Sequence, residues 1–234
     1  MKTLCVAVVV LSLTSVCQPA LLACKQLLKP VDRDPDFSGR WYVIAVASNT
    51  CLLPGLLNAV FSPSIALDIT SSNTPNVYNV SILSKWHGYC DNDTSSFFYG
   101  NNTLFDADNN NDTSDELSEL LQSGCPDCVV TKGGDTFTIL MLLSRRKTVT
   151  AAEMKEFATQ TECLGWYKPE VLSTDHEYEN CNSLEDDDFD FDIPEIWNMV
   201  SQRLDSVLLN CILERLLYYC KVAFGWFQQM WNIL

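Results

Sequence analysis

Cationic side chains are scarce in this sequence. Its 234 residues include 15 Lys and Arg against 30 Asp and Glu, so the formal net charge is -15 at pH 7, and no basic cluster is longer than residues 145–147. Clustered Lys and Arg are what neutralise phosphate groups. Nucleic acid and anionic membranes are therefore not expected as partners. The acidic balance favours neutral or cationic small ligands, or simply keeps the protein soluble.

Motifs for catalysis and metal binding are also lacking. The two histidines, His87 and His176, are isolated, and there is no nucleophile elbow, no Gly-rich phosphate loop and no His pair at i, i+4. The pair Cys125 and Cys128 has Cys-x-x-Cys spacing, which also suits a redox or zinc site. However, no second pair lies at zinc-finger spacing and no βαβ pattern surrounds it. We expect no enzyme, no cofactor and no metal site.

The apolar run at the N-terminus, Leu4–Leu13, is too short to span a bilayer. It follows a basic start and is followed by small residues up to Cys17, which is the pattern of a secretory signal peptide. We expect residues 1–17 to be removed, with cleavage after Ala20 or Ala23 as alternatives. The mature protein is then expected to be secreted and extracellular.

Cysteines, in contrast, are abundant. Eleven are ordinary for an exported protein, in which disulfides persist. Removal of the signal peptide leaves nine, so one thiol is free, paired between chains, or wrongly counted as part of the mature protein. Four Asn-x-Ser/Thr sequons crowd the middle of the chain and predict a glycosylated surface. Their asparagines are Asn79, Asn92, Asn101 and Asn111.

Short β-rich runs separated by Ser, Asn, Asp, Pro and Gly clusters fill the region from Trp41 to Leu143. This spacing indicates an all-β barrel or sandwich. An apolar stretch, Cys51–Val60, predicts a loop with a helical turn that covers a barrel mouth, and Asp106–Thr113 predicts an exposed loop. The expected strands are Trp41–Ala47, Ser64–Ile69, Val77–Leu83, Ser95–Tyr99, Thr103–Phe105, Cys128–Thr131 and Thr136–Leu143.

The C-terminal third predicts one helix, an acidic linker and a tail. Capping-box spacing from Thr150 predicts a helix over Ala151–Leu164. Self-repelling carboxylates then predict a disordered linker over 182–193 and a domain boundary there. Apolar residues at helical spacing predict an amphipathic tail over 194–234. We expect this tail to do one of three things: pack over the barrel, associate with another chain, or bind a lipid or lipoprotein surface.

Two motifs carry a family resemblance. Gly39-Arg40-Trp41 opens the first expected strand, and Arg145 ends the last one. This order resembles the lipocalin family. Over residues 24–181 the chain looks more specifically like the branch that contains alpha-1-acid glycoprotein, apolipoprotein M and the fish plasma proteins that bind saxitoxin, tetrodotoxin or tributyltin. The segments that carry this likeness are Leu143–Phe157, Glu162–Gly165, Cys24–Pro30 and Cys125–Cys128.

The resemblance implies an eight-stranded up-and-down antiparallel lipocalin barrel with a flanking helix after it. In this family the Trp, here Trp41, closes the barrel floor and the Arg, here Arg145, packs across it, a contact worth about 1 kcal/mol. A local Cys125–Cys128 bridge would leave Cys51 unpaired, and an isomerase activity seen in some lipocalins would depend on that thiol, although the pairing of Cys51, Cys211 and Cys220 stays open. The disulfides implied by position are Cys24–Cys163, Cys90–Cys181 and a local Cys125–Cys128 bridge.

Strand alternation predicts which side chains face the barrel interior. If Asn79 and Asn101 carry sugars, their side chains must point outward, and Arg145 is expected to point inward. These three residues decide which alternate side chains face the interior on their strands. The interior set fills a core or surrounds one small hydrophobic or amphiphilic ligand, which makes the protein a carrier. The alternative is an extracellular interaction protein that acts through its C-terminal helix. The predicted ligand-binding residues are Val43, Ala45, Leu67, Tyr78, Val80, Ile82, Phe98, Phe137, Ile139 and Met141.

Overall fold

A computed structural model gives the structure of the chain. The signal peptide predicted over 1–17, Asn111, Phe137 and nearly all of the acidic linker and the tail lie outside the described residues. No described helix is both long and apolar enough to cross a bilayer. The structure describes residues 23–32, 34–107, 116–134, 138–179 and 181–183, together with 198, 201, 209 and 211–213.

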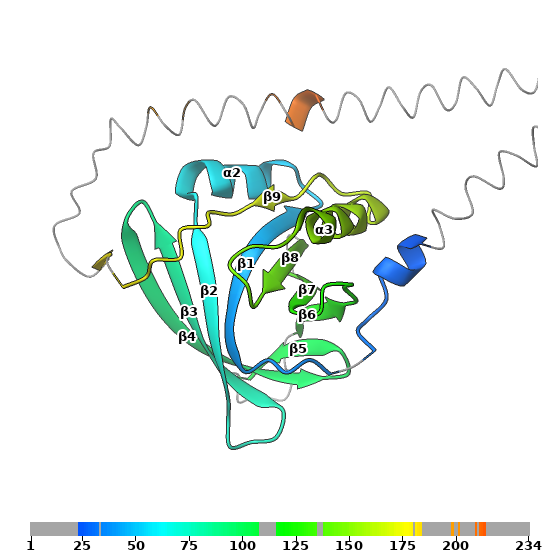
Figure 1. Ribbon diagram of the computed structural model, residues 1–234, viewed down its shortest axis with the longest axis vertical. Helices are drawn as coiled ribbons and strands as arrows, with labels where there is room; N and C mark the ends of the chain where they lie inside the picture. The colour runs from blue at the N-terminus through cyan, green and yellow to red at the C-terminus, as the bar shows by residue number, and fades with distance from the viewer. Residues whose placement is uncertain are drawn as a thin grey trace, which may run out of the picture.

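Eight antiparallel strands form a closed barrel, as expected (Figure 1). Each strand pairs with the next one along the chain, including β4 with β5, and β1 pairs with β8, which closes the barrel. Two short strands, β9 (Glu170–Val171) and β10 (Asn182–Ser183), add to the outer edges of β1 and β4. The barrel strands are β1 (Gly39–Ser48), β2 (Ser64–Ser71), β3 (Val77–Trp86), β4 (Tyr89–Gly100), β5 (Thr103–Asp106), β6 (Glu116–Leu121), β7 (Cys128–Gly133) and β8 (Ile139–Ser144).

Strand β6 was not among the strands expected from the sequence. Its sequence, Glu-Leu-Ser-Glu-Leu-Leu, has neither the β-branched nor the aromatic residues typical of strands. The register also shifts where β5 meets β6, between Leu104 and Phe105. Tertiary pairing with β5 and β7 therefore forms this strand in spite of its weak local preference.

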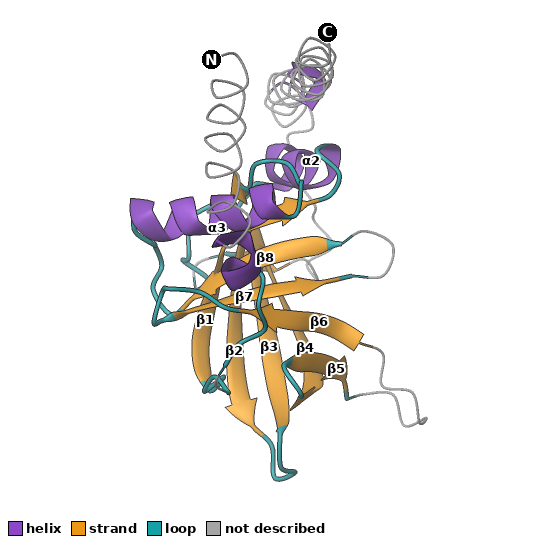
Figure 2. Cartoon of the chain, turned by 90° about the vertical axis from the view of Figure 1, so that its right-hand side faces the viewer, coloured by secondary structure: helices purple, strands orange, loops and turns teal. Residues whose placement is uncertain are grey.

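Helices α2 and α3 lie outside the barrel (Figure 2). Helix α2 (Leu52–Phe61) follows β1 directly and ends at Ser62, whose φ of 43° is left-handed. Helix α3 (Ala151–Cys163) begins with the predicted capping box, because Thr150 and Glu153 exchange side-chain and backbone hydrogen bonds. Its Phe157 is buried in a cluster with outward-facing residues of β1, β7 and β8, which fixes the helix against the barrel wall.

A β-bulge in β1 reverses the side-chain alternation within that strand. The register against β8 shifts between Val43 and Ala45. Consequently Val43 and Val46 both face the interior, whereas Ala45 belongs to the outer cluster under α3. The prediction that Ala45 faces the ligand is therefore wrong, because strict alternation was carried through a bulge.

Four disulfides connect the described residues. The three implied pairs, Cys24–Cys163, Cys90–Cys181 and Cys125–Cys128, are present. The expectation of a free thiol at Cys51 is wrong, because Cys51 at the start of α2 is bonded to Cys211 of the tail, 160 residues away. An isomerase reaction that depends on a Cys51 thiolate is not available in this disulfide-bonded form.

Candidate functional site

The interior of the barrel contains a cavity of about 580 Å³. This volume lies within the range of small-molecule sites, about 300–1,000 Å³. Strands β1 to β8 all contribute to its wall, and Pro54 and Leu57 reach it from α2. Helix α2 therefore covers part of the cavity mouth, as the sequence predicted for this segment.

Six of the predicted interior residues line the cavity. Strand β3 is regular over its whole length, so the alternation counted from Asn79 holds, and Asn79 itself is exposed. On β2 and β8 the inward parity is likewise the one expected. The six residues are Val43, Leu67, Val80, Ile82, Ile139 and Met141.

Two aromatic residues predicted to line the cavity do not line it. Tyr78 packs against the interior core, where it contacts Phe37 and stacks on Phe97 at 5.3 Å between ring centroids, but it is not part of the cavity lining. Phe98 faces outward and is 38% exposed, whereas Phe97 lines the cavity. The parity of β4 was counted from Asn101, which lies in the turn after the strand and has a φ of 54°. Alternation does not continue through such a turn.

Several lining residues were not predicted. Phe37 comes from the segment before β1, Val46 follows the bulge, and Leu172 comes from the segment after α3. Phe37 and Leu172 lie outside the long strands, so period-2 counting could not find them. Phe37 does carry a signal, since it is an isolated large apolar residue among polar neighbours just before Gly39-Arg40-Trp41, whereas Leu172, which follows Val171, carries none.

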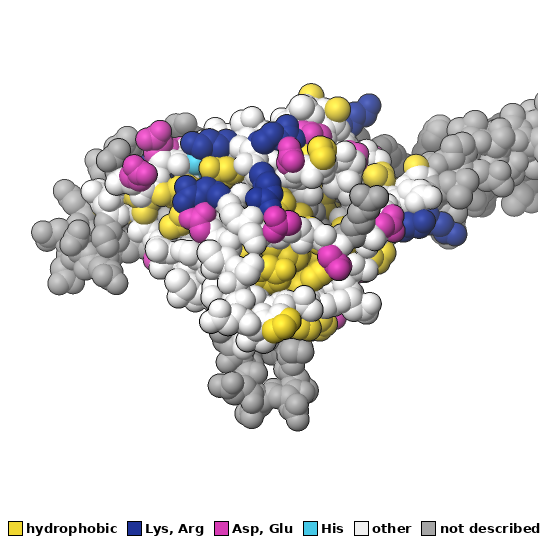
Figure 3. Space-filling model, turned by 60° about the horizontal axis from the view of Figure 1, so that its bottom comes forward, with side chains coloured by type: hydrophobic (Ala, Val, Ile, Leu, Met, Phe, Trp, Pro, Cys, Tyr) yellow, Lys and Arg dark blue, Asp and Glu magenta, His cyan; other side chains and the backbone are white. Residues whose placement is uncertain are grey.

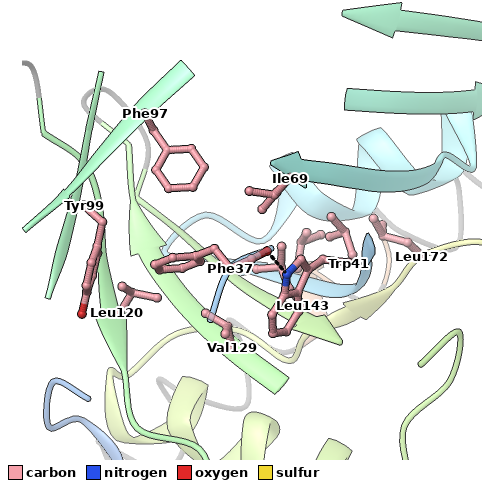
Figure 4. Packing of buried hydrophobic residues seen from close by; sticks show 11 residues of the cluster. Phe37, Trp41, Ile69, Phe97, Tyr99, Leu120, Val129, Leu143 and Leu172 are labelled. Atoms are coloured by element: carbon pink, nitrogen blue, oxygen red, sulfur yellow. Dashed lines mark hydrogen bonds between the residues drawn. The ribbon is translucent and has the colours of Figure 1, made fainter. Parts of the chain in front are cut away.

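Trp41, at the start of β1, packs in the main hydrophobic core (Figure 4). Trp41 is 4% exposed, and its Nε1 donates a 2.7 Å hydrogen bond to the carbonyl of Phe37. The guanidinium of Arg145 lies 4.5 Å from the centre of the indole ring and donates to the carbonyls of Ser38 and Asp36. One cation-π contact and two hydrogen bonds thus tie the first strand, the last strand and the N-terminal segment together.

Gly39 permits this arrangement. Its φ of +101° is a backbone conformation that residues with a side chain rarely adopt. A Cβ atom there would also lie 2.9 Å from the guanidinium of Arg145. The glycine two residues before Trp41 is therefore required by the packing of Arg145 over the indole.

The cavity lining is almost wholly apolar. Its polar side chains are three hydroxyls: Ser95 on β4, Ser118 on β6 and Thr131 on β7. None of the described residues that line it is charged. On the face of the molecule in Figure 3, Lys and Arg side chains lie beside Asp and Glu side chains. Among the described residues, charge therefore belongs to the surface and leaves the cavity suited to an uncharged guest.

Residues 170–179, here called the strap, cross the outside of the barrel after α3. Strand β9 at its start pairs with β1. Asn58 of α2 donates a 3.2 Å hydrogen bond to the carbonyl of Val171, and Leu172 reaches the cavity. The strap therefore joins the covering helix to the barrel wall.

A buried histidine fastens the strap to the barrel. His176 Nδ1 lies 2.8 Å from Ser64 Oγ at the start of β2, and the Tyr178 hydroxyl lies 2.9 Å from the same oxygen. The imidazole also packs on the ring of Tyr42 in β1, with 4.6 Å between ring centroids. Protonation of His176 would place a cation in this contact.

Acid will weaken the protein through His176. Burial lowers its pKa below 6.5, with opposing effects from the charges of Lys147 and Asp175. The unfolded chain therefore binds the proton first, so the stability is full above about pH 6.5 and is lost as the pH falls toward the folded-state pKa. The slope is at most about 1.4 kcal/mol per pH unit for one proton. His176→Gln should flatten this part of the profile in urea unfolding, and a variant with the same pH profile as the wild type would contradict this role.

Comparison with known proteins identifies the family. A model described as the ApoM domain matches residues 8–186. No curated protein matches the chain significantly. One similar solved structure is that of the siderocalin Ex-FABP, described as acting through dual ligand specificities. It has 17% sequence identity and a TM-score of 0.43, and the match covers 58% of this chain and 92% of that one. Because the family match extends over more than half of its length, the chain belongs to the ApoM domain family of lipocalins.

Proposed function

We propose that the protein is a carrier that holds one small, uncharged hydrophobic molecule inside the barrel and performs no chemistry on it. The observation that carries this proposal is the 580 Å³ cavity, whose described lining has only three hydroxyls among apolar side chains. Apolar pockets of this size with a few polar groups are typical of small-molecule sites. Toxins, steroids, sphingolipids and organotins are the ligand classes that the sequence resemblance suggests, and a lining without carboxylates favours the neutral ones over cationic ones.

We also propose that the carrier is exported and glycosylated. The N-terminal signal pattern and four disulfides support passage through an oxidising compartment. Three of the sequon asparagines, Asn79, Asn92 and Asn101, are exposed on the outside of the barrel, where sugars can be accommodated.

A second candidate function involves the C-terminal tail. Leu209, Ile212 and Leu213 are exposed, at 59%, 64% and 44% of their surface. Such a group of apolar side chains is typical of contact surfaces. The tail would then bind a lipid or lipoprotein surface, or a second copy of the chain, while the barrel serves as a scaffold.

One titration separates the two functions. A fluorescent apolar probe added to the purified protein should light up with one saturable site. The same result is expected for a variant that ends after Ser183 and carries Cys51→Ser, because the cavity wall is made by the barrel, α2 and the strap. Absence of a saturable site in the folded full-length protein would refute the carrier. Retained probe binding with loss of vesicle or self-association in the shortened variant would assign association to the tail.

A further inference from the structure

The hydroxyls of the cavity lie on strands β4, β6 and β7. Ser118 and Thr131 lie on the neighbouring strands β6 and β7, where Ser118 pairs with Gly133 and Thr131 pairs with Leu120. Ser95 on β4 pairs with Val80 of β3, whose own lining residues, like those of β2, are all apolar. A ligand therefore meets only hydrocarbon along β2 and β3, and hydroxyl groups among apolar side chains along β4, β6 and β7.

Thr131 stands out among these residues. It is 4% exposed, and within the described part of the chain its Oγ1 is buried and has no hydrogen-bond partner. The described residues contain a few other buried side-chain nitrogen or oxygen atoms that lack a hydrogen-bond partner. Among these atoms, only Thr131 Oγ1 belongs to a residue that lines the cavity. An unsatisfied buried hydroxyl destabilises the folded protein, and most buried polar groups are paired. Because this oxygen has almost no accessible surface in the empty cavity, a guest meets it when the side chain turns about χ1, a rotation that lets the hydroxyl and the methyl group exchange places.

We propose that Thr131 determines the specificity of the cavity, by hydrogen bonding to one uncharged oxygen of a hydrophobic ligand, an alcohol or a carbonyl. This inference rests on the proposed carrier function. A threonine hydroxyl both donates and accepts, so it serves either oxygen type. Thr131 lies between Val129 and Gly133 on β7, which all line the cavity. The ligand oxygen is therefore placed along the side of the guest, with apolar surface on both sides of it.

The lining also excludes charged versions of such a ligand. A carboxylate, phosphate or ammonium group that enters an apolar cavity loses its water and needs an opposite charge in return. The described lining residues carry no charge of either sign. A hydroxyl or ketone loses far less and is repaid by one hydrogen bond.

Two probes that differ by one oxygen test this role. Fluorene and 9-fluorenone have nearly the same rigid shape, and their binding to the full chain can be followed by tryptophan fluorescence. Thr131→Val replaces the hydroxyl with a methyl group of similar size. It should weaken 9-fluorenone binding about threefold to tenfold and leave fluorene binding unchanged or tighter. Thr131→Ser should restore 9-fluorenone binding, and the melting temperature of ligand-free Thr131→Val should not fall.

The outcomes that contradict the proposal are distinct. Suppose that the wild type binds both probes, while Thr131→Val weakens the binding of both equally or leaves both unchanged. In that case Thr131 is a packing residue and the carrier function stands. If the folded wild type binds neither probe and no other apolar probe, both the carrier function and the role of Thr131 are refuted. A lower melting temperature of the ligand-free valine variant would show that the hydroxyl is satisfied within the protein.

Discussion

Replacing Ile82 with aspartate will raise the Kd of an apolar probe by at least about 100-fold. Ile82 lies in the middle of β3 and lines the cavity. In the empty barrel a carboxylate at this position keeps contact with water in the cavity. A hydrophobic guest must strip that water away, which costs several kcal/mol because nothing in the described lining compensates the charge. A 100-fold change in Kd corresponds to about 2.7 kcal/mol.

The neighbouring residue supplies the control. Leu83 lies on the opposite face of the same strand and does not line the cavity. Leu83→Asp introduces the same charge into β3 with the same loss of apolar surface in the strand, but it should leave the Kd within about a factor of two. Both variants should keep the circular dichroism spectrum of the wild type. A folded Ile82→Asp protein with the affinity of the wild type would place the bound probe outside the barrel.

Trp41→Ala will lower the free energy of unfolding by about 3–5 kcal/mol, the usual cost of removing a large buried aromatic side chain. Trp41 packs in the main core with Phe37, Val43 and Leu143. The substitution also removes the surface on which Arg145 stacks and the indole N–H that satisfies the carbonyl of Phe37. Chemical denaturation with guanidinium measures the loss directly.

A graded series distinguishes the contributions at this position. Trp41→Phe keeps a ring beneath Arg145 but loses the hydrogen bond to Phe37, so its loss should be intermediate, about 1–3 kcal/mol. Arg145→Lys keeps the positive charge but cannot reach both Ser38 and Asp36 with a planar fork. If Trp41→Ala were no less stable than Trp41→Phe, the indole would not stabilise this part of the core.

The contact between Arg145 and Trp41 and the regular strands could be predicted from the sequence. Both depend on local patterns: the floor motif has a glycine with a special φ two residues before the indole, and β3 alternates without interruption from Val77 to Trp86. Alternation failed where the backbone departs from it, at the bulge before Ala45 and across the turn after Phe98. A register error of one residue moves a side chain to the opposite face.

Other parts of the site depend on long-range contacts that no local pattern encodes. Leu172 enters the cavity because the strap pairs with β1, and β6 forms because two neighbours pair with it. The partner of Cys51 could not be chosen either, since several pairings among nine cysteines satisfy the same sequence. These features become visible only when segments far apart in the chain are brought together.

The Cys51–Cys211 bridge has a consequence for proteolysis. Any single cut of the backbone between these two residues leaves the two pieces covalently joined, since each piece keeps one of the bonded sulfur atoms. The acidic stretch 184–192 lies within this interval. Cleavage there would therefore convert the protein into a two-chain form, and the tail would leave only after reduction. Since α2 both holds Cys51 at its start and covers the cavity, protease and reductant together, rather than either alone, would free this cover from the tail.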